Sequence, residues 1–422
     1  MSHSDNPNHS AARRQFLARA GLAAVATPLA QSAFAASTPA AASEVEPFWG
    51  KHQSGIATPA QRNTYFVAFD LATTKRDDLV ALLRAWTDAA AEMTSAPAKF
   101  DPKADPNQPS VQSGATVGLA VSRLTLTFGF GPSLFEKDGE DRFGLAQRRP
   151  EALVDLPRFA GDQLIPERTG GDLSLQACAD DPQVVESAVR RLAEAASGIA
   201  TMRWAQMGFT GNFKPGATPR IPMGFKDGTM NVATGDPAAM SKFVWVGDEG
   251  PDWMRDGSYM VVRPIRIALE HWDRMKISFQ EETIGRYKAS GAPLGAKNEF
   301  DPLDLKAVDK DGNPLIAENS HVALSAPENN GGAQILRRAF SYDNGLAKIA
   351  ERWPPWRQLV TFDAGLLFQC YQRDPRTGFI RIFARMAQID MLNQFTTHVG
   401  SGLFACPPGA SPGGFVGQRL FA

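Results

Sequence analysis

The stretch DLSLQACADDPQVVESAVRRLAEAAS, residues 172–197, decides the fold class. Its first part, residues 172–178, alternates polar and apolar side chains, as a half-buried β-strand does. Its second part, residues 182–197, repeats apolar side chains at helical spacing, and Asp180 and Asp181 stand where a helix N-terminus is capped. A strand that leads directly into an amphipathic helix indicates a mixed α and β fold.

The rest of the chain repeats this alternation. Residues 62–71 and 122–130 are predicted strands, and residues 77–93 are a predicted amphipathic helix. The order strand, helix, strand, strand, helix, strand is that of a ferredoxin-like unit. A similar plan returns later, with predicted strands and helices over residues 258–267, 269–285, 365–372, 380–393 and 402–406. We therefore expect an α+β fold of two ferredoxin-like halves, with antiparallel sheets and peripheral helices.

Composition narrows the class of protein. The chain has 422 residues, a hydrophobic content of 43% and a formal net charge of −1, which are typical of a soluble globular protein. Without a basic surplus, no nucleic-acid partner is expected. Beyond the N-terminus, no apolar run reaches the roughly 18 residues of a membrane span. We expect an export signal over residues 1–35 and a linker with an N-terminal arm over residues 36–60. Two halves follow, residues 61–220 and residues 221–422.

The N-terminus has the features of an export signal. Arg13 and Arg14 precede an apolar segment, residues 20–26, and Ala33-Phe34-Ala35 is a small-x-small cleavage pattern. The paired arginines resemble a twin-arginine signal, although Ala12 stands where Ser or Thr is usual. A mitochondrial presequence or an unstructured tail is the alternative. We expect a periplasmic or otherwise exported protein that folds, and loads any cofactor, before it crosses the membrane.

Cysteines and histidines limit the cofactors. Cys178, Cys370 and Cys406 are isolated, which argues against a disulfide framework and against thiolate metal sites. The histidines after residue 35 are not spaced for a shared metal: His52, His271, His321 and His398. Each could be an ordinary packed or surface residue, and His398 is expected at a helix end. A cofactor that needs one protein ligand remains open, and haem is such a cofactor.

Two further segments carry candidate chemistry. GFKDGTMN, residues 224–231, places Asp227 between two glycines, which by itself is typical of a surface turn. ILRRAFSY, residues 335–342, contains Arg337, for which a structural ion pair is the alternative reading. One acid on a glycine turn, one histidine and one arginine form an unusual combination in an exported chain.

With its neighbouring motifs, this combination resembles the dye-decolorizing peroxidase family, and within it the exported deferrochelatase/peroxidase subclass. The resemblance covers nearly all of the chain after the signal, in the order PFWGKHQSGI (47–56), DLSLQACADD (172–181), MGFKDGTMN (223–231), YMVVRPIRI (259–267), EHWDRM (270–275), ETIGRYKASGAPLG (282–295), ENSHVAL (318–324), ILRRAFSY (335–342) and GLLFQCYQRD (365–374). It implies one haem b per chain, lying between the two ferredoxin-like halves.

The resemblance also implies roles for individual residues. His321 matches the iron ligand of the C-terminal half, Asp227 the distal acid and Arg337 the distal arginine, with Arg338 as the alternative if the alignment is shifted by one. The haem contacts that it implies are Gly228, Thr229, Met230, Ala326, Pro327, Glu328, Arg337, Leu366 and Phe368. Glu328 departs from the subclass, which has a basic residue there, so one contact to a haem propionate is in doubt. Asp363 is the expected hydrogen-bond acceptor of His321.

These roles predict a haem-dependent peroxidase. Asp227 would move a proton between the two oxygens of hydrogen peroxide, and Arg337 would stabilise the charge that develops as their bond breaks. An aspartate base favours activity at mildly acidic pH, since such acids ordinarily ionise near pH ~4.

The expected reductants are bulky phenols, dyes or porphyrins. The alternative is a haem-binding deferrochelatase or carrier in periplasmic iron acquisition; an iron-uptake partner and a homodimer remain open. An exported α+β protein without a cofactor would leave the acid, histidine and arginine unexplained.

Overall fold

Two βαββαβ units account for most of the described chain, which in this computed structural model comprises residues 45–100, 103, 105, 107, 114–214, 216–353 and 356–422. The side chains of residues 347–360 are not among those described. The predicted export signal, residues 1–35, and residues 36–44 of the linker segment lie outside the described residues. The described residues all belong to one compact unit, Ser43–Ala422.

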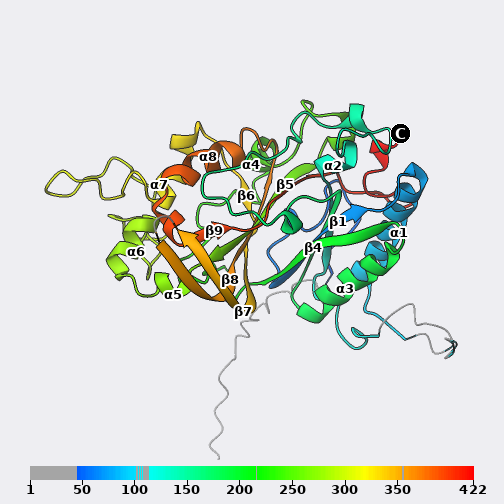
Figure 1. Ribbon diagram of the computed structural model, residues 1–422, viewed down its shortest axis with the longest axis horizontal. Helices are drawn as coiled ribbons and strands as arrows, with labels where there is room; N and C mark the ends of the chain where they lie inside the picture. Colours follow the sequence, from blue (N-terminus) through cyan, green and yellow to red (C-terminus); the bar gives the residue numbers. More distant parts are fainter. Residues whose placement is uncertain are drawn as a thin grey trace, which may run out of the picture. The chain divides into compact units, whose positions relative to one another are not determined.

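The first unit has the predicted ferredoxin-like order. Its elements are β1 (Asn63–Leu71), α1 (Arg76–Ser95), β2 (Thr125–Phe130), β3 (Leu173–Ala179), α3 (Pro182–Ala195) and β4 (Ala200–Phe209). The strands pair antiparallel in the order β4-β1-β3-β2, and α1 and α3 lie together on one side of this sheet (Figure 1). Asp181 caps α3 as predicted, because its side chain accepts hydrogen bonds from the backbone N–H groups of Gln183 and Val184.

The second unit repeats this order with longer connections. Its elements are β5 (Ser258–Ile267), α5 (Leu269–Trp272), α6 (Ile277–Ile284), α7 (His321–Ser325), β7 (Phe340–Trp353), β8 (Trp356–Gln372), α8 (Phe379–Ile389) and β10 (Gly402–Cys406). Its strands pair antiparallel in the order β10-β5-β8-β7. The remaining short elements are α2 (Pro132–Phe135), α4 (Pro237–Phe243), β6 (Leu336–Arg337) and β9 (Thr396–His398), with β6 paired to β8 and β9 paired to β5.

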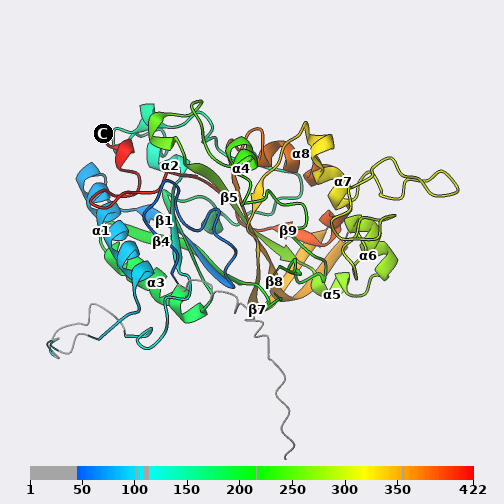
Figure 2. The ribbon, with the colours of Figure 1, turned by 180° about the vertical axis from the view of Figure 1, so that it is seen from behind.

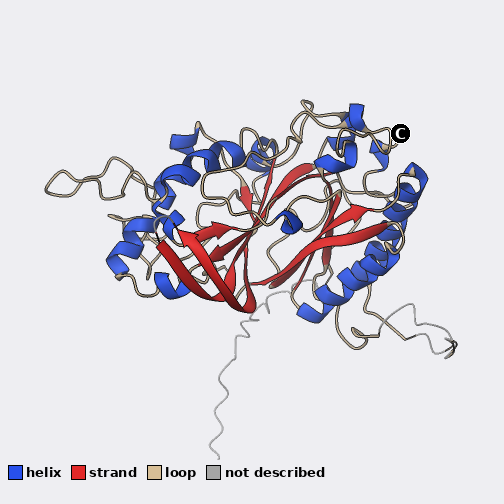
Figure 3. Cartoon of the chain, in the orientation of Figure 1, coloured by secondary structure: helices blue, strands red, loops and turns tan. Residues whose placement is uncertain are grey.

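The two sheets join at both edges. Phe209 of β4 pairs with Ser341 of β7, and Phe130 of β2 pairs with Ala405 of β10. The eight main strands therefore form one closed antiparallel ring, which removes the exposed strand edges that favour aggregation. Figure 3 shows the strands at the centre with helices outside them, and Figure 2 shows the same arrangement from behind. The predicted α+β fold with large antiparallel sheets is confirmed.

A buried apolar cluster holds the two units together. Its members come from strands of both units and include Phe66, Trp204, Met260, Tyr371 and Phe404. A second cluster packs α1 and α3 against the outer face of the first sheet. Since burial of apolar surface is the main stabilising term, these clusters fix the sheet on which the loops of the site are carried.

Four details differ from the sequence prediction. The strand expected over residues 122–130 begins only at Thr125, because Ser122 and Arg123 adopt left-handed backbone angles, with φ of 54° and 56°. The helix expected over residues 269–285 is broken into α5 and α6. Gln280 donates from its side chain to the carbonyl of Trp272 over 2.7 Å, and the Met275 N–H donates to the same carbonyl over 3.0 Å, which stabilises the break. His398 ends a strand rather than a helix, and β7 was not predicted from the sequence.

Candidate active site

Asp227 stands on a sharply turned loop. Gly224 and Gly228 have φ of +84° and +115°, a region that side-chain-bearing residues rarely occupy. A Cβ atom at Gly224 would also lie 2.7 Å from Cε of Lys288. The Asp227 N–H donates to the carbonyl of Pro219 over 2.9 Å, which closes the loop. The glycines are therefore needed for the backbone conformation that presents Asp227.

The loop presents Asp227 to Arg337. Nη1 of Arg337 donates to Oδ1 of Asp227 over 2.6 Å, and the two side chains keep 28% and 20% of their surface exposed. Asn231 fixes the backbone of Arg337: its Nδ2 donates to the Arg337 carbonyl and its Oδ1 accepts from the Arg337 N–H, both over 2.8 Å. Sequence reasoning missed this role of Asn231, although the residue ends the GFKDGTMN motif.

Arg337, and not its neighbour, faces the candidate acid. Arg338 directly follows β6, and its guanidinium instead donates to the carbonyl of Thr58 and to the side chain of Gln61. A cavity of about 460 Å³ reaches the Asp227–Arg337 pair. Its walls include Asn231 and Leu366, the N-terminal arm and the loop around Thr218. The pair is therefore accessible to a molecule as small as peroxide.

His321 is the first residue of α7. Its Nδ1 donates to Oδ2 of Asp390 over 2.8 Å, and Asp390, which also accepts from the Leu392 N–H, keeps only 3% of its side chain exposed. The ring keeps 34% of its surface exposed, and its Nε2 makes no hydrogen bond within the part of the chain that the structure describes, so it can serve as a ligand. Burial lowers the pKa of His321, but Asp390 raises it by more, so that the net shift is upward.

The predicted acceptor of His321 is wrong. Asp363 instead accepts from Nε of Arg266 and from Nδ2 of Asn344, each over 2.9 Å. Asp390 replaces it because α8 packs on α7: Leu324 of α7 lies in a buried cluster with Ile382 and Met386 of α8. The end of α8 thereby brings Asp390 to His321.

His321, Asp227 and Arg337 share one electrostatic environment. The charge of Arg337 lowers the pKa of His321 and the charge of Asp227 raises it, so both charges act on the ring although the residues come from separate loops. Leu366 of β8 packs in the apolar cluster that contains Phe225 and Val322, the residues two before Asp227 and one after His321. Apolar surface thus accompanies the polar groups.

Arg286 is a further cation at the site that sequence reasoning missed. It follows Gly285, whose positive φ allows the end of α6 to approach Ser320. Arg286 is buried, and its Nη1 donates to the carbonyls of Gly291 and Glu299 over 2.7 and 3.0 Å. Burial lowers its pKa, Glu299 raises it and Arg337 lowers it. A buried guanidinium with carbonyl acceptors favours an anionic group nearby.

The other predicted contact residues are distributed around this centre. Thr229 hydrogen-bonds Glu299, whereas the side chain of Met230 is 56% exposed. Ala326 is buried, and Pro327 and Glu328 begin a 3-10 turn after α7. Leu366 lines the cavity, and Phe368 on the same strand packs at 5.8 Å from the ring of Phe379.

The donor set fits haem better than a bare metal ion. Among the described residues, no group of three His, Cys, Asp or Glu side chains is placed to hold a metal ion. The site instead offers one imidazole with its Nδ1 bonded to a carboxylate, which orients a ligating ring. The guanidinium groups of Arg286 and Arg337 are cations of the kind that pairs with the two propionates of a haem. The residues present therefore fit this cofactor.

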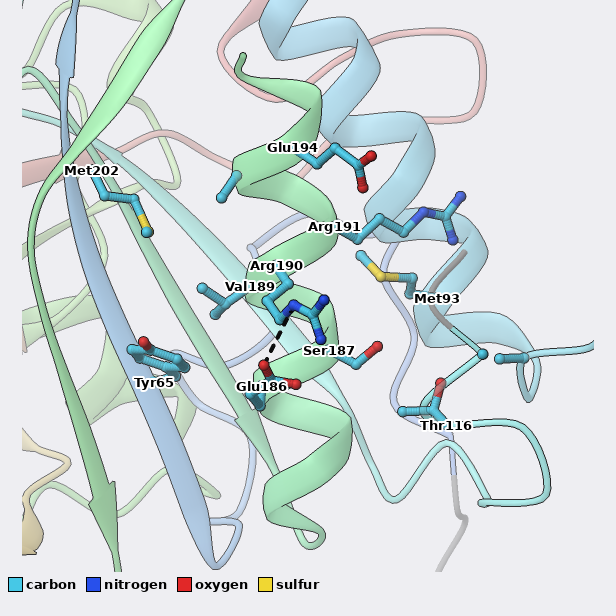
Figure 4. Close-up of a pocket in the computed structure, with 13 residues that line it drawn as sticks. Tyr65, Met93, Thr116, Glu186, Ser187, Val189, Arg190, Arg191, Glu194 and Met202 are labelled. Atoms are coloured by element: carbon cyan, nitrogen blue, oxygen red, sulfur yellow. Dashed lines mark ion pairs between the residues drawn. The ribbon is translucent and has the colours of Figure 1, made fainter. Parts of the chain in front are cut away.

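A second groove, of about 420 Å³, is a poor candidate for the site. It runs along α3 and is lined by apolar residues such as Tyr65, Val189 and Met202, with the ion pair of Glu186 and Arg190 at 3.5 Å on its rim (Figure 4). Among the described residues that line this groove there is no histidine or cysteine, and none of them also lines the cavity at Asp227.

Comparison with known proteins identifies the family. The model of the N-terminal part of Dyp-type peroxidases matches residues 53–210, and that of the C-terminal part matches residues 218–411. The chain belongs to the Dyp-type peroxidase family. The dye-decolorizing peroxidase of Thermobifida fusca is 38% identical, over 100% of this chain and 99% of its own. The deferrochelatase of Escherichia coli is 35% identical, over 96% of this chain and 95% of its own.

Solved structures of the family share the fold. The DyP-type peroxidase from Streptomyces coelicolor is 39% identical and superimposes with a TM-score of 0.80, over 89% of this chain and 97% of its own. Ferric DtpA from Streptomyces lividans is 38% identical, with a TM-score of 0.81, over 92% of this chain and 100% of its own. This Dyp-type peroxidase is a haem-dependent oxidoreductase that uses hydrogen peroxide and organic substrates. No helix in the described part of the chain combines the length and the apolar character that crossing a membrane requires.

Proposed function

We propose that His321 would ligate the haem iron and that Asp227 and Arg337 would act on peroxide. The observation that carries this proposal is the Asp227–Arg337 pair at 2.6 Å, beside a cavity and coupled electrostatically to His321. Asp390 holds the imidazole from behind through Nδ1. The remaining ring nitrogen would then be the one that ligates the iron.

The chemistry follows from these positions. Haem, when bound, supplies the iron that binds peroxide and takes up its oxidising equivalents. Asp227 accepts a proton from one peroxide oxygen and returns it to the other, so that water can leave. Arg337 holds Asp227 in place through Nη1 and places positive charge where negative charge develops. Asp390 accepts a hydrogen bond from His321 and thereby increases the electron density that the ring donates.

The cofactor would be held by the chain's own cations and apolar surface. Arg286 and Arg337 would supply the positive charge that neutralises haem propionates. Arg286 would replace the basic residue that the subclass has at the position of Glu328. Leu366 would keep water from the reacting oxygens, and residues 228–230 and 326–328 would contact the porphyrin. We propose one haem b per chain between the two halves, residues 61–220 and residues 221–422, the second of which carries the ligand.

The reducing substrate is bulky and reacts from outside. Dyes and porphyrins are large and rigid, and a haem enclosed by the chain would not contact them directly, so such reductants would transfer electrons from the protein surface. A deferrochelatase activity, release of iron from haem with the porphyrin intact, is the second candidate function. The 35% identity to the Escherichia coli deferrochelatase over nearly the whole chain favours it as an activity of the same site.

The proposal that the protein is exported rests on the amino-acid sequence before Val45. Arg13 and Arg14 ahead of an apolar segment support export by the twin-arginine route to the periplasm. There the protein could meet an iron-uptake system or pair with a second copy of itself. Fractionation of cells that express the chain with Arg13 and Arg14 changed to Lys tests the route, and unchanged export would contradict it.

An absorption spectrum tests the assignment of the site. Protein purified from haem-supplied cells should show a haem band that changes on addition of one equivalent of peroxide, and it should then oxidise a dye. Asp227→Asn should keep the haem band but respond slowly to peroxide. If the haem band of the wild-type protein does not change on addition of peroxide, and iron is released to leave free porphyrin, the deferrochelatase function would be favoured.

A further inference from the structure

We propose that Glu299 is a positioning residue for the peroxide step, because its carboxylate clamps both flanks of the turn that carries Asp227. This inference rests on the proposed function of Asp227. Glu299 lies in the long connection between α6 and α7, 72 residues after Asp227 in sequence. No motif of the sequence marks it.

The two carboxylate oxygens have separate partners. Oε2 of Glu299 forms an ion pair with Nζ of Lys226, the residue before Asp227. Oε1 accepts a hydrogen bond of 3.0 Å from Oγ1 of Thr229, two residues after Asp227. One rigid, planar group therefore holds the chain on either side of the Asp227–Gly228 dipeptide.

The fold makes room for this clamp. A Cβ atom at Gly291 would lie 2.7 Å from Cδ of Lys226 and 3.5 Å from Cγ of Glu299, so the glycine lets the lysine stem pass towards the carboxylate. Arg286 donates to the backbone carbonyl of Glu299 over 3.0 Å and so fixes the position from which Glu299 reaches out.

The clamp is partly withdrawn from water. The side chains of Glu299 and Lys226 keep 12% and 22% of their surface exposed, so this pair is less screened than a surface ion pair. Burial raises the pKa of Glu299, but its hydrogen bonds to Lys226, Thr218 and Thr229 lower it by more. The carboxylate is therefore held ionised, as a clamp on an ammonium group requires.

The turn needs such a clamp for a physical reason. Glycines at both ends of residues 224–228 give the backbone more conformational freedom to lose than any other residues would. A displacement of about 1 Å of a catalytic group can lower a rate by about 100-fold. Glu299 holds the turn at Lys226 and at Thr229, on either side of Asp227. It thereby keeps the Asp227 carboxylate in position to react with peroxide.

Glu299→Gln is the decisive variant, measured in haem-loaded protein. Gln keeps the shape and can still accept from Thr229, but its amide cannot pair with the Lys226 ammonium. We expect kcat/KM for hydrogen peroxide to fall about tenfold, while haem content and KM for the reductant stay unchanged. Hydrogen exchange of the amides of residues 224–231 should become faster. Lys226→Met should give the same changes, and the double variant should add little to either.

Glu249→Gln is the matched control. Glu249 forms a comparable interloop ion pair with Arg373 at 2.6 Å, in a segment that contacts none of the proposed catalytic residues. The control should alter neither the peroxide kinetics nor the exchange of residues 224–231. If Glu299→Gln and Lys226→Met both keep wild-type kinetics and exchange while Asp227→Asn is disabled, the clamp is refuted and the role of Asp227 stands. If Asp227→Asn itself reacts normally with peroxide, the proposed function fails instead.

Discussion

Asp227 and His321 both belong to the candidate site, and the chain supports them in different ways. Asp227 stands on a glycine turn held by Arg337, by the backbone of Pro219 and by Glu299 through the neighbouring residues. His321 begins a short helix, and one carboxylate from the end of α8 fixes its ring. A turn braced at several points can tolerate the loss of one brace. A ring with one acceptor depends on that acceptor alone.

The difference also explains what the sequence could reveal. Asp227, Arg337 and His321 lie in local motifs, so they could be named from the chain and from the family resemblance. Asp390 could not, because its approach to His321 depends on how α8 packs against α7, 69 residues later in the chain. Asp363 stood in an equally suitable motif, and only the pairing with Arg266 shows that it is engaged elsewhere.

The fold shows the same division between local and distant information. Each βαββαβ unit follows from helical and strand periodicity, which is local. The closure of the ring depends on Phe209 meeting Ser341 and Phe130 meeting Ala405, contacts that no periodicity encodes. The long strand β7 was missed because its residues, with Asp343, Asn344 and Gly345 near the start, look like a turn.

The largest effect is expected when the ligand itself is removed. His321→Ala should abolish tight haem binding and with it peroxidase activity, since the described site offers no second imidazole to the iron. Haem titration followed by absorption measures this directly. His52→Gln is the control, because His52 hydrogen-bonds the carbonyl of Asp256 and stacks on Trp245 away from the site. Undiminished haem affinity in His321→Ala would overturn the assignment of the ligand.

Removal of the Asp227 carboxylate should slow the reaction with peroxide and leave haem binding at His321 unchanged. Asp227→Asn keeps the size of the side chain but cannot accept the proton, so kcat/KM for peroxide should fall about 10²- to 10⁴-fold. The haem spectrum before peroxide should change little, because Asp390 and His321 are untouched. Stopped-flow mixing with peroxide gives the rate. A variant that keeps more than a tenth of the wild-type rate would show that another group moves the proton.

The support of His321 should have an intermediate effect. In Asp390→Asn, Nδ1 of His321 can donate only to an amide oxygen instead of a carboxylate. Haem affinity or turnover should therefore fall about 10- to 100-fold. The reduction potential of the iron should rise, because the ring then donates less electron density. Asp363→Asn tests the acceptor that the structure rejects, and it should leave the potential unchanged. Equal shifts in both variants would mean that the effect is long-range electrostatics rather than a bond to His321.

The smallest effect is expected from a single brace on the Asp227 side. Asn231→Ala removes both hydrogen bonds to the Arg337 backbone, which should lower the free energy of unfolding by about 1–2 kcal/mol. The pairing of Arg337 with Cys370 in β6 and β8 remains, as does the ion pair with Asp227, so kcat/KM for peroxide should fall by less than about tenfold. Denaturant unfolding and stopped-flow kinetics measure the two quantities. Asn344→Ala, in a polar network with Asp363 and Gln206, should affect stability without slowing peroxide. A loss in Asn231→Ala as large as that in Asp227→Asn would mean that the turn has no redundant support, and the two sides of the site would then depend equally on single contacts.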